Sequence, residues 1–546
     1  MVMKMNTWIA RARWVPLVLA MVALTACGDT NADTETDEQE DLCQQAADHH
    51  EQCTGEFITP PICDEDALAQ AEFVLSVSCE AYDQTFVSDG KADGAFCDWF
   101  GTGCTPDEQI FTGPACEEDG QCDAQNFCVE GHCFGGVTSP EFQESLDQFT
   151  ASQEIEGNNA QLLIHNVATR YLRRDMVQNA LESIHFSALL IEDNESGQEF
   201  IQDLVDAAGR GVEVRVVVDA TSHYFGSSYE MLTTLAEGGV KVISFNPITE
   251  WSSLRLMPEY WGLTANMRLH EKILVVDSRE AILGGRNVGD SYYDQGRWRD
   301  VDIYLSGPGV IAAQEMFLRI WNRIVDWERV AGCASATNYG IYCPPDNKEP
   351  VQGSVYYPEF IAAGEARTRV VHSDPYSQET SHGYVTTLSL VRAARESITI
   401  ANAYFIPPRR LRTHLRAAAE RGVEVRVVAN SKTSTDSSPV YYAGLNFYKE
   451  LIRGGVEIYE YNGTETLHSK VMLIDGEVAL IGSYNLDPRS AIDNSESMVL
   501  VRDSQAVADL QDALQEDIMN STLATDDIPW TELAKARLHR IAEPLL

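Results

Sequence analysis

Basic residues are scarce in this sequence. Its 546 residues include 40 lysines and arginines against 83 aspartates and glutamates, which gives a formal net charge of -43. Residues 28–150 contain a single basic residue, Lys91, and residues 151–546 hold 54 acidic residues against 36 basic ones. Because nucleic acids and anionic membrane surfaces attract basic protein faces, this charge disfavours a general binder of either, and phosphate chemistry would require a local cluster of basic groups.

Long apolar runs are missing beyond the N-terminus. After residue 27 no run approaches the roughly 18 apolar residues of a membrane-spanning helix, whereas a basic segment and a short apolar stretch predict a cleavable signal peptide over residues 1–26. Its end, Leu24-Thr-Ala-Cys27-Gly, resembles the bacterial lipobox. This resemblance implies an exported protein that is lipid-anchored through Cys27 to a bacterial envelope membrane, facing the periplasm or the cell surface. Residues 27–42 are predicted to form an acidic tether.

Paired CxxC and HxxxH spacings are absent, which disfavours zinc as the role of the thirteen cysteines. Apart from Cys27, an even number remains behind an export signal, so we expect six intramolecular disulfides. Ten of these cysteines define a small cysteine-rich module over residues 43–135. The sequence leaves its pairing open and indicates no partner for it. The other two, Cys333 and Cys343, are expected to pair with each other.

The remainder of the chain alternates amphipathic helices with short β-branched strands, which predicts an α/β architecture. The pattern occurs twice. The string RGVEVRVV at residues 210–217 returns at residues 421–428, each time after an alanine-rich helical segment. We therefore predict two homologous halves, residues 155–330 and residues 355–530, joined by a connector over residues 331–354.

Each half ends in the same pattern of reactive side chains: a histidine, a lysine two residues later, an aspartate five residues after the lysine, and then a Gly-Gly or Gly-Ser step followed by an asparagine. The two sets are His270, Lys272, Asp277, Gly284, Gly285 and Asn287, and His468, Lys470, Asp475, Gly482, Ser483 and Asn485. Residues two apart on a strand share a face, so each histidine projects with its lysine, and each aspartate is better interpreted as a structural anchor. The glycine step lets the backbone approach closely and returns the asparagine to the site.

Two copies with identical spacing resemble the HxKx4D signature of the phospholipase D superfamily, and the likeness covers about residues 160–525. Further strings resemble the bacterial cardiolipin synthase branch: WRDVD at 298–302, AYFIPP at 403–408 and NLDPRS at 485–490. The resemblance implies two tandem phospholipase D-like α/β/α sandwiches related by pseudo-twofold symmetry, with one active site at their interface.

The same resemblance implies a phosphodiesterase that acts on phospholipids through a phosphohistidine and ends in hydrolysis or phosphatidyl transfer. A neutral imidazole attacks phosphorus and a protonated one donates to the leaving oxygen, which two histidines with a pKa near about 6.5 could supply. In the family the first-half histidine attacks, which assigns His270 as nucleophile and His468 to acid–base work. The near-symmetric halves leave the reverse assignment open. No metal or other cofactor is required.

Other residues are expected to support these histidines. The donors expected to bind the non-bridging phosphate oxygens are Lys272, Lys470, Asn287 and Asn485. Acidic residues are expected to fix the imidazole tautomers. Glu496, 28 residues after His468, stands where the family has an acid, and Asp300 is its counterpart in the first half, with Asp302 a weaker candidate.

Bacterial cardiolipin synthases generally begin with hydrophobic membrane segments, whereas this chain begins with a signal peptide and an acidic cysteine-rich module. This departure favours an exported phospholipase D or phosphatidyl transferase over cardiolipin synthesis itself. The alternatives are an exported nuclease of the same superfamily, which the negative charge disfavours, and a non-catalytic lipid-binding surface protein, which two intact motifs disfavour. The sequence does not specify the headgroup.

Overall fold

The computed structural model describes residues 116, 122, 126–129, 132–222, 227–246, 267–293, 297–331, 351, 353–375 and 381–540. All of them lie within one compact unit, Asp93–Leu546. The predicted signal peptide, tether and Cys333–Cys343 pair, together with most of the cysteine-rich module, lie outside the described residues. No helix in the described part of the chain is long and apolar enough to cross a membrane.

The described end of the cysteine-rich module is a hairpin of β1 (Asn126–Val129) and β2 (His132–Gly135). Disulfides join Cys116 to Cys128 and Cys122 to Cys133. The expectation of disulfides is confirmed for these four cysteines, and the structure supplies a pairing that the sequence left open. The sulfurs of Cys116, Cys122 and Cys133 lie within 4.8 Å of one another, but each is already committed to a bridge.

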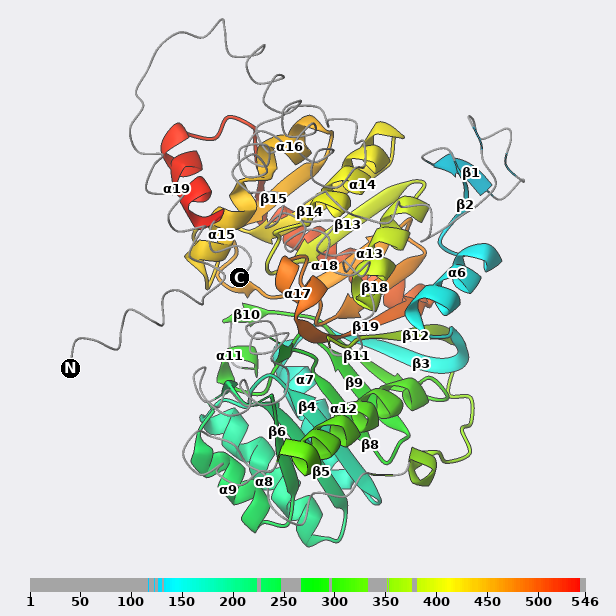
Figure 1. Ribbon diagram of the computed structural model, residues 1–546, viewed down its shortest axis with the longest axis vertical. Coiled ribbons are helices and arrows are strands. Elements are labelled where there is room, and N and C mark those ends of the chain that lie inside the picture. The colour runs from blue at the N-terminus through cyan, green and yellow to red at the C-terminus, as the bar shows by residue number, and fades with distance from the viewer. Residues whose placement is uncertain are drawn as a thin grey trace, which may run out of the picture. The chain divides into compact units, whose positions relative to one another are not determined.

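The first half combines a sheet with helices (Figure 1, cyan to green). Its strands are β3 (Ile155–Leu163), β4 (Ser183–Ala188), β5 (Glu213–Asp219), β6 (Lys241–Phe245), β7 (Arg268–Leu269), β8 (Ile273–Val276), β9 (Glu280–Gly284), β10 (Trp298–Arg299) and β11 (Asp302–Ser306). Its helices are α7 (Asn166–Asn179), α8 (Glu195–Gly209), α9 (Tyr229–Glu237), α11 (Asp290–Tyr293) and α12 (Val310–Ala331). Strands β4, β5 and β6 run parallel, and β8, β9, β11 and β3 continue the sheet in antiparallel pairs.

The second half also combines a sheet with helices (Figure 1, yellow to red). Its strands are β12 (Ala366–Ser373), β13 (Ser397–Asn402), β14 (Glu424–Asn430), β15 (Glu457–Tyr461), β16 (Thr466–Leu467), β17 (Lys470–Ile474), β18 (Val478–Gly482), β19 (Asn494–Arg502) and β20 (Ser521–Leu523). Its helices are α13 (His382–Ala393), α14 (Arg409–Glu420), α15 (Ser438–Leu445), α16 (Tyr448–Arg453), α17 (Pro488–Ile492), α18 (Ser504–Met519) and α19 (Trp530–Arg540). A 3-10 turn, η9 (Gly353–Tyr356), precedes this half, and α6 (Pro140–Thr150) precedes the first.

Strands β10 and β16 form a separate two-stranded sheet. The other strands of both halves form one sheet in the order β20-β15-β14-β13-β17-β18-β19-β12-β3-β11-β9-β8-β4-β5-β6, with β7 paired to β19. The strands on the two sides of the central β12–β3 pair correspond in order. Outward from β12 they are β19, β18, β17, β13, β14 and β15, and outward from β3 they are β11, β9, β8, β4, β5 and β6. The mixed α/β fold in two parts that the sequence predicted is confirmed.

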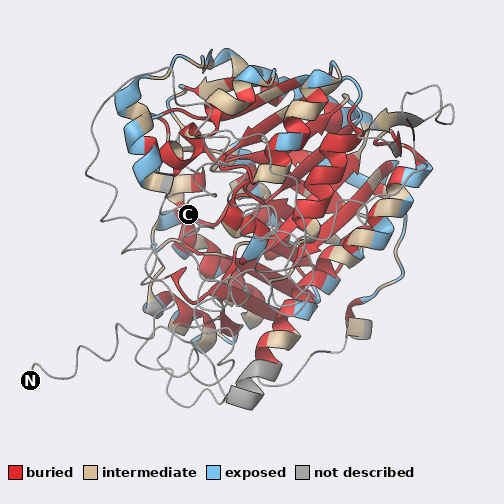
Figure 2. Cartoon of the chain, turned by 45° about the horizontal axis from the view of Figure 1, so that its top comes forward, coloured by how far each residue is buried: buried red, intermediate tan, exposed pale blue. Residues whose placement is uncertain are grey.

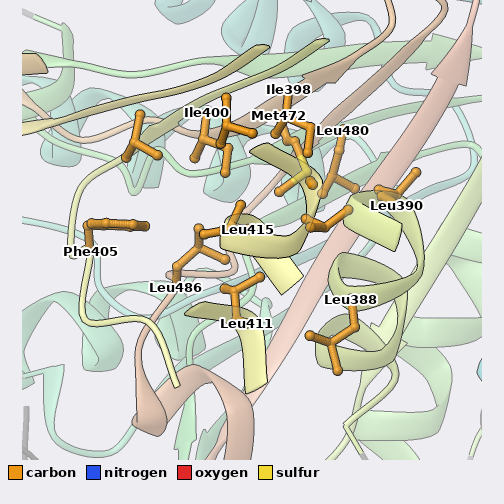
Figure 3. Packing of buried hydrophobic residues seen from close by; sticks show 14 of the residues in the cluster. Leu388, Leu390, Ile398, Ile400, Phe405, Leu411, Leu415, Met472, Leu480 and Leu486 are labelled. Atoms are coloured by element: carbon orange, nitrogen blue, oxygen red, sulfur yellow. The ribbon is translucent and has the colours of Figure 1, made fainter. Parts of the chain in front are cut away.

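Side chains that alternate along the strands supply separate apolar layers. In β5, Val216 packs with helices α7, α8 and α9, whereas its neighbour Val217 packs on the other face with α12. The layer that contains α12 also holds residues of the second half, including residues of α18. This apolar layer is therefore continuous across both halves. Figure 2 shows these strands as mostly buried. The opposite face of the second-half sheet packs against α13 and α14, as Figure 3 shows for Ile400 and Leu415.

The duplicated Arg-Gly string ends a helix and starts a strand in each half. Gly211 and Gly422 have φ values of +94° and +95°, a left-handed conformation that favours glycine directly after a helix. The preceding arginine donates from its guanidinium to backbone carbonyls at the end of an earlier helix: Arg210 to Val177 at 3.0 Å, and Arg421 to Arg392 at 3.3 Å. The repeat in sequence therefore reflects a repeated packing contact.

The motif aspartates are backbone anchors. The Asp277 carboxylate accepts hydrogen bonds from the backbone N–H groups of residues 181–183 at 2.7–3.2 Å, and Asp475 accepts from residues 395–397 at 2.8–3.1 Å. Both aspartates have positive φ, 52° and 54°, in tight turns after β8 and β17. Each carboxylate therefore ties the end of a motif strand to the start of its neighbour, away from the histidines.

Replacing Asp277 with alanine should lower the free energy of unfolding without removing a catalytic group. Three backbone donors lose their acceptor, which should lower the free energy of unfolding by about 1–3 kcal/mol, measured by denaturant titration. Asp277→Asn keeps one acceptor oxygen and should cost less. Asp512→Ala, which removes an exposed carboxylate on α18, is the control and should change stability by under about 0.5 kcal/mol. Normal stability of Asp277→Ala combined with lost turnover would instead make this carboxylate part of the reaction.

Candidate active site

Two short parallel strand pairings bring the motifs of the two halves together. In one, β7 pairs with β19 so that Leu269 lies opposite Ser495, and the His270 N–H donates to the Ser495 carbonyl at 3.0 Å. In the other, β10 pairs with β16, and the His468 N–H donates to the Arg299 carbonyl at 2.7 Å. Each motif histidine therefore lies beside the residue that precedes an acidic residue of the opposite half. Figure 1 shows β10, β19 and α17 where the halves meet.

This strand pairing places an acidic residue of each half against the motif histidine of the other half. His270 Nδ1 lies 2.9 Å from both carboxylate oxygens of Glu496, and His468 Nδ1 lies 2.6 Å from Asp300 Oδ2. Both carboxylates are fully buried, and the histidines are nearly so. The structure thus places both predicted acids on the histidines. Which acid contacts which histidine depends on the pairing between halves, which spacing within one half does not reveal.

The motif lysines lie directly against the histidine backbone. Lys272 Nζ donates to the carbonyl of His270, and Lys470 Nζ donates to the carbonyl of His468 and lies 2.9 Å from His468 Nδ1. Both side chains are buried. Burial lowers the pKa of Lys272 to about 7 and also lowers the pKa of Lys470, against the opposing pull of the nearby carboxylates. The site therefore holds two buried lysines beside two buried carboxylates.

Both histidines favour the neutral form. Burial lowers the pKa of His270 to about 4, assisted by Lys272 and only partly opposed by Glu496. Burial and the Lys470 ammonium hold the pKa of His468 well below its usual range. The sequence led us to expect two imidazoles with ordinary pKa values near neutrality. That expectation omitted desolvation and the two adjacent lysines, which both disfavour an imidazolium.

The two carboxylates differ in their surroundings. Glu496 also accepts hydrogen bonds from the Ser483 hydroxyl, from Ser490 Oγ at 2.7 Å and from Asn494 Nδ2 at 3.1 Å. Burial acts to raise the pKa of Glu496, but His270, Lys272 and these donors outweigh it, so its pKa lies below the usual value. For Asp300 burial prevails, and its pKa is raised despite Lys470 and Arg286. Glu496 is therefore the better stabilised anion.

The Gly-Gly and Gly-Ser pairs of the two motifs lie directly against the two buried carboxylates. A Cβ on Gly285 would lie 2.4 Å from Asp300 Oδ1, so only glycine leaves room for this carboxylate. In the second half the same position is Ser483, whose hydroxyl donates to Glu496. The Gly482 position also needs glycine, because a Cβ there would lie 2.3 Å from the Ser497 carbonyl. Close backbone approach is thus confirmed, and Ser483 and Ser490 are carboxylate partners that were not predicted from the sequence.

The two motif asparagines are buried but differ in their partners. Asn287 Nδ2 donates to the Tyr292 hydroxyl at 2.7 Å, and its Oδ1 accepts from the Leu190 N–H at 3.4 Å. The Asn485 side-chain oxygen is buried without a hydrogen-bond partner. The Asn287 side chain is therefore engaged within its own half, and Asn485 retains unused hydrogen-bonding capacity.

Asp302, the weaker candidate for orienting a histidine, lies in a separate arginine network. Its Oδ2 is 2.9 Å from the Arg173 guanidinium and 3.4 Å from that of Arg286. Arg286 itself donates to the Leu163 carbonyl at 2.8 Å. This fully buried network fixes the backbone next to Asp300, so Asp302 supports the site without contacting an imidazole.

Aromatic rings cover one side of His468. The Trp298 ring lies 4.3 Å from the imidazole between centroids, and the Tyr292 ring lies 5.6 Å from it. Tyr292 also meets Trp298 edge to face at 4.7 Å. The only signal for this contact in the sequence is the aromatic character of Trp298 within the WRDVD string.

Comparisons with known proteins agree with this geometry. The family model for "Cardiolipin synthase, PLD-like domain" matches residues 174–321 and 387–518. The chain is 30% identical over 349 residues to a probable cardiolipin synthase, YwiE, of Bacillus subtilis, covering 63% of each chain. It is 30% identical over 382 residues to a cardiolipin synthase of Listeria welshimeri, covering 68% of this chain and 72% of the relative.

Among solved structures, phosphatidylserine synthase of Haemophilus influenzae matches with a TM-score of 0.52 at 15% identity, covering 71% of this chain and 95% of that chain, which supports the fold alone. The chain spans 63%, 57% and 65% of the lengths of three cardiolipin synthase relatives, so the match is to part of each. On the matched segments and the level of identity, the chain belongs to the phospholipase D-like family, in its cardiolipin synthase-like branch.

Proposed function

We propose that the protein is a phospholipase D-type phosphodiesterase that acts on phospholipids through a phosphohistidine intermediate, with hydrolysis or phosphatidyl transfer as the outcome. The observation that carries the proposal is the crossed pairing of two histidines with two buried carboxylates, beside two buried lysines. Because each carboxylate engages Nδ1, the Nε2 atom of each imidazole is left for chemistry at phosphorus. The cardiolipin synthase relatives support a phospholipid as substrate.

In the first step His270 is the nucleophile. Its Nε2 lone pair attacks phosphorus, the bond from phosphorus to the headgroup oxygen breaks, and a proton from His468 Nε2 passes to that oxygen. A phosphorylated imidazole that keeps its Nδ1 proton is cationic, so it is best formed beside the better stabilised anion, which is Glu496. This asymmetry supports His270 over the reverse assignment.

In the second step, water or an alcohol resolves the phosphohistidine. Its oxygen attacks phosphorus, its proton passes to His468 Nε2, and the bond from phosphorus to His270 breaks. Lys272 and Lys470 are proposed to stabilise the non-bridging oxygens as cationic donors, with the side-chain NH2 group of Asn485 as a further donor. The bound phosphate anion also favours a proton on His468, which offsets the burial and lysine charges that lower its pKa in the free protein.

The two halves are proposed to be related by a pseudo-twofold axis with a single active site between them. Strand order runs in matching fashion outward from β12 and β3, and both β7–β19 and β10–β16 are parallel pairs between halves. Each half supplies one histidine and the carboxylate for the other histidine. A single site therefore uses both motifs at once.

The wild-type protein should release headgroup from phosphatidylglycerol or phosphatidylcholine and form a new phospholipid when an alcohol is added. His270→Ala and His468→Ala should each lower this turnover by at least about 10²–10⁴-fold, because a nucleophile or a positioned proton donor is lost. Glu420→Gln, an exposed carboxylate at the end of α14, should leave turnover unchanged. Lipid products are measured by chromatography.

A nitrophenyl phosphodiester separates the two histidines, because its good leaving group needs little protonation. On this substrate His468→Ala should still form an acid-labile phosphoprotein, and His270→Ala should form none. Mass spectrometry that places the phosphoryl group on His468 would reverse the assignment. No covalent adduct in either variant, with activity restored by a divalent metal, would refute the mechanism.

Each acid contacts the histidine of the opposite half, so a variant of an acid should resemble the variant of the histidine that the acid contacts, and not that of the histidine in its own half. Glu496→Gln should behave as His270→Ala does and slow phosphoprotein formation, whereas Asp300→Asn should mainly slow substrates with poor leaving groups. Losses of about 10²–10⁴-fold are expected, since such an acid fixes the tautomer and stabilises the imidazolium. The ratio of rates on lipid and nitrophenyl substrates measures this. The opposite grouping would show that the acids serve the histidines of their own halves.

The protein is also proposed to be exported and lipid-anchored at Cys27, as the lipobox-like end of the signal peptide suggests. In a bacterial host, Cys27→Ser should move the protein from the membrane fraction to the soluble fraction of the envelope, because a lipid anchor provides the membrane affinity. Fractionation with immunodetection measures this. Unchanged membrane association of Cys27→Ser would contradict lipidation at this residue.

A further inference from the structure

Glu271 lies between His270 and Lys272 in the first motif, and its carboxylate is fully buried. His270 contacts Glu496, whereas Glu271 contacts Ser495, the residue before Glu496 on β19. Neighbouring side chains of a strand point to opposite faces, so Glu271 lies behind the face that carries the histidine. The proposed mechanism gives this buried charge no role.

Three side chains from three segments form a buried cluster around this charge. The Ser495 hydroxyl donates to Glu271 Oε2. His372 Nε2, on β12, lies 3.4 Å from the same carboxylate oxygen and 3.2 Å from Ser495 Oγ. The segments are themselves joined, since β12 pairs with β19 and the His270 N–H donates to the Ser495 carbonyl at 3.0 Å. Glu271 therefore belongs to the contact that sets His270 beside Glu496.

The cluster is costly as a purely structural feature. Glu271 Oε1 and His372 Nδ1 are both buried without a hydrogen-bond partner. A buried carboxylate with an unpaired oxygen destabilises the folded state. A glutamine would still accept the hydrogen bond from Ser495, and it would bury no charge. What only a carboxylate supplies at this position is negative charge one residue from Lys272.

This charge acts on Lys272. Burial lowers the pKa of Lys272 to about 7, and the Lys470 ammonium also acts to lower it. Carboxylates from three segments oppose this shift: Glu496, Asp300 and Glu271. Glu496 and Asp300 each bind a motif histidine, and Glu271 does not. From β12, the titratable group that faces Glu271 is His372.

We propose that Glu271 is a positioning residue of the first motif, held in place by Ser495 and His372. Its charge keeps Lys272 in the ammonium form at neutral pH, and its hydrogen bond to Ser495 supports the strand pairing between the halves. The inference rests on the proposed function, in which Lys272 binds non-bridging oxygens of the phosphodiester. Glu271 contacts no substrate, and it extends to higher pH the range in which the site binds a phosphate anion.

The test measures the pH dependence of kcat/KM for nitrophenol release from a nitrophenyl phosphodiester, a reaction that needs little protonation of the leaving group. We expect kcat/KM to fall as the pH rises and Lys272 loses its proton. Glu271→Gln keeps the shape and an acceptor but loses the charge, so the fall should occur about one pH unit lower than in wild type. Glu271→Asp keeps the charge and should retain the wild-type profile, although its shorter side chain should lower kcat/KM at every pH by about tenfold or less.

Two further variants separate the charge from the hydrogen bond. Ser495→Ala removes the hydrogen bond and leaves the charge, so it should lower kcat/KM without moving the pH profile. The exposed Glu420→Gln should change neither. The position of the fall on the pH axis does not depend on the folded fraction, so partial misfolding cannot produce the shift. An unmoved profile in Glu271→Gln, or an equal shift in Glu271→Asp, would overturn the inference.

Sulfate binding provides a measurement that needs no turnover. Sulfate keeps its charge between about pH 6 and pH 9, so its affinity, measured by calorimetry, should fall with rising pH about one unit lower in Glu271→Gln than in wild type. If the sulfate profiles differ in this way but wild type converts no phosphodiester, the role of Glu271 stands and the proposed function fails. If both proteins convert the phosphodiester with the same pH profile, the proposed function stands and the inference fails.

Discussion

The crossed hydrogen bonds from His270 to Glu496 and from His468 to Asp300 are the interactions on which the site depends. They exist because two short parallel strand pairs exchange backbone hydrogen bonds between the halves. They also supply partners for two buried carboxylates, whose burial would be costly without such partners. Every other part of the site supports them. Glycine makes room for one acid, serine hydroxyls bind the other, and buried arginines hold the adjacent backbone.

The local parts of this arrangement could be predicted from sequence. The two motifs, the anchoring role of Asp277 and Asp475, the glycine step and the duplicated helix–strand junction depend on residues close together in the chain. The choice of acid for each histidine could not be predicted, because 226 residues separate His270 from Glu496 and 168 separate Asp300 from His468. The lowered histidine pKa values were missed for a similar reason, since burial belongs to the assembled interface.

Buried charges of both signs meet in the site. Two buried lysines and two neutral histidines meet two carboxylates, and the lysine pKa values are lowered by burial. A phosphodiester would add the negative charge that favours protonated groups around it. In the proposed function this would let an acidic protein bind phosphate at one point, through buried lysines and not through its surface charge. It also separates this chain from proteins that bind phosphate along an extended basic face.

The antiparallel β12–β3 pair, which makes one sheet of both halves, limits how the molecule can move. Backbone hydrogen bonds and a shared apolar layer run across this boundary, so bending there would break a sheet and expose a core at the same time. Hinge closure of one half upon the other at this boundary would therefore be costly. The shared sheet therefore keeps the two histidines and their carboxylates in a fixed relative geometry.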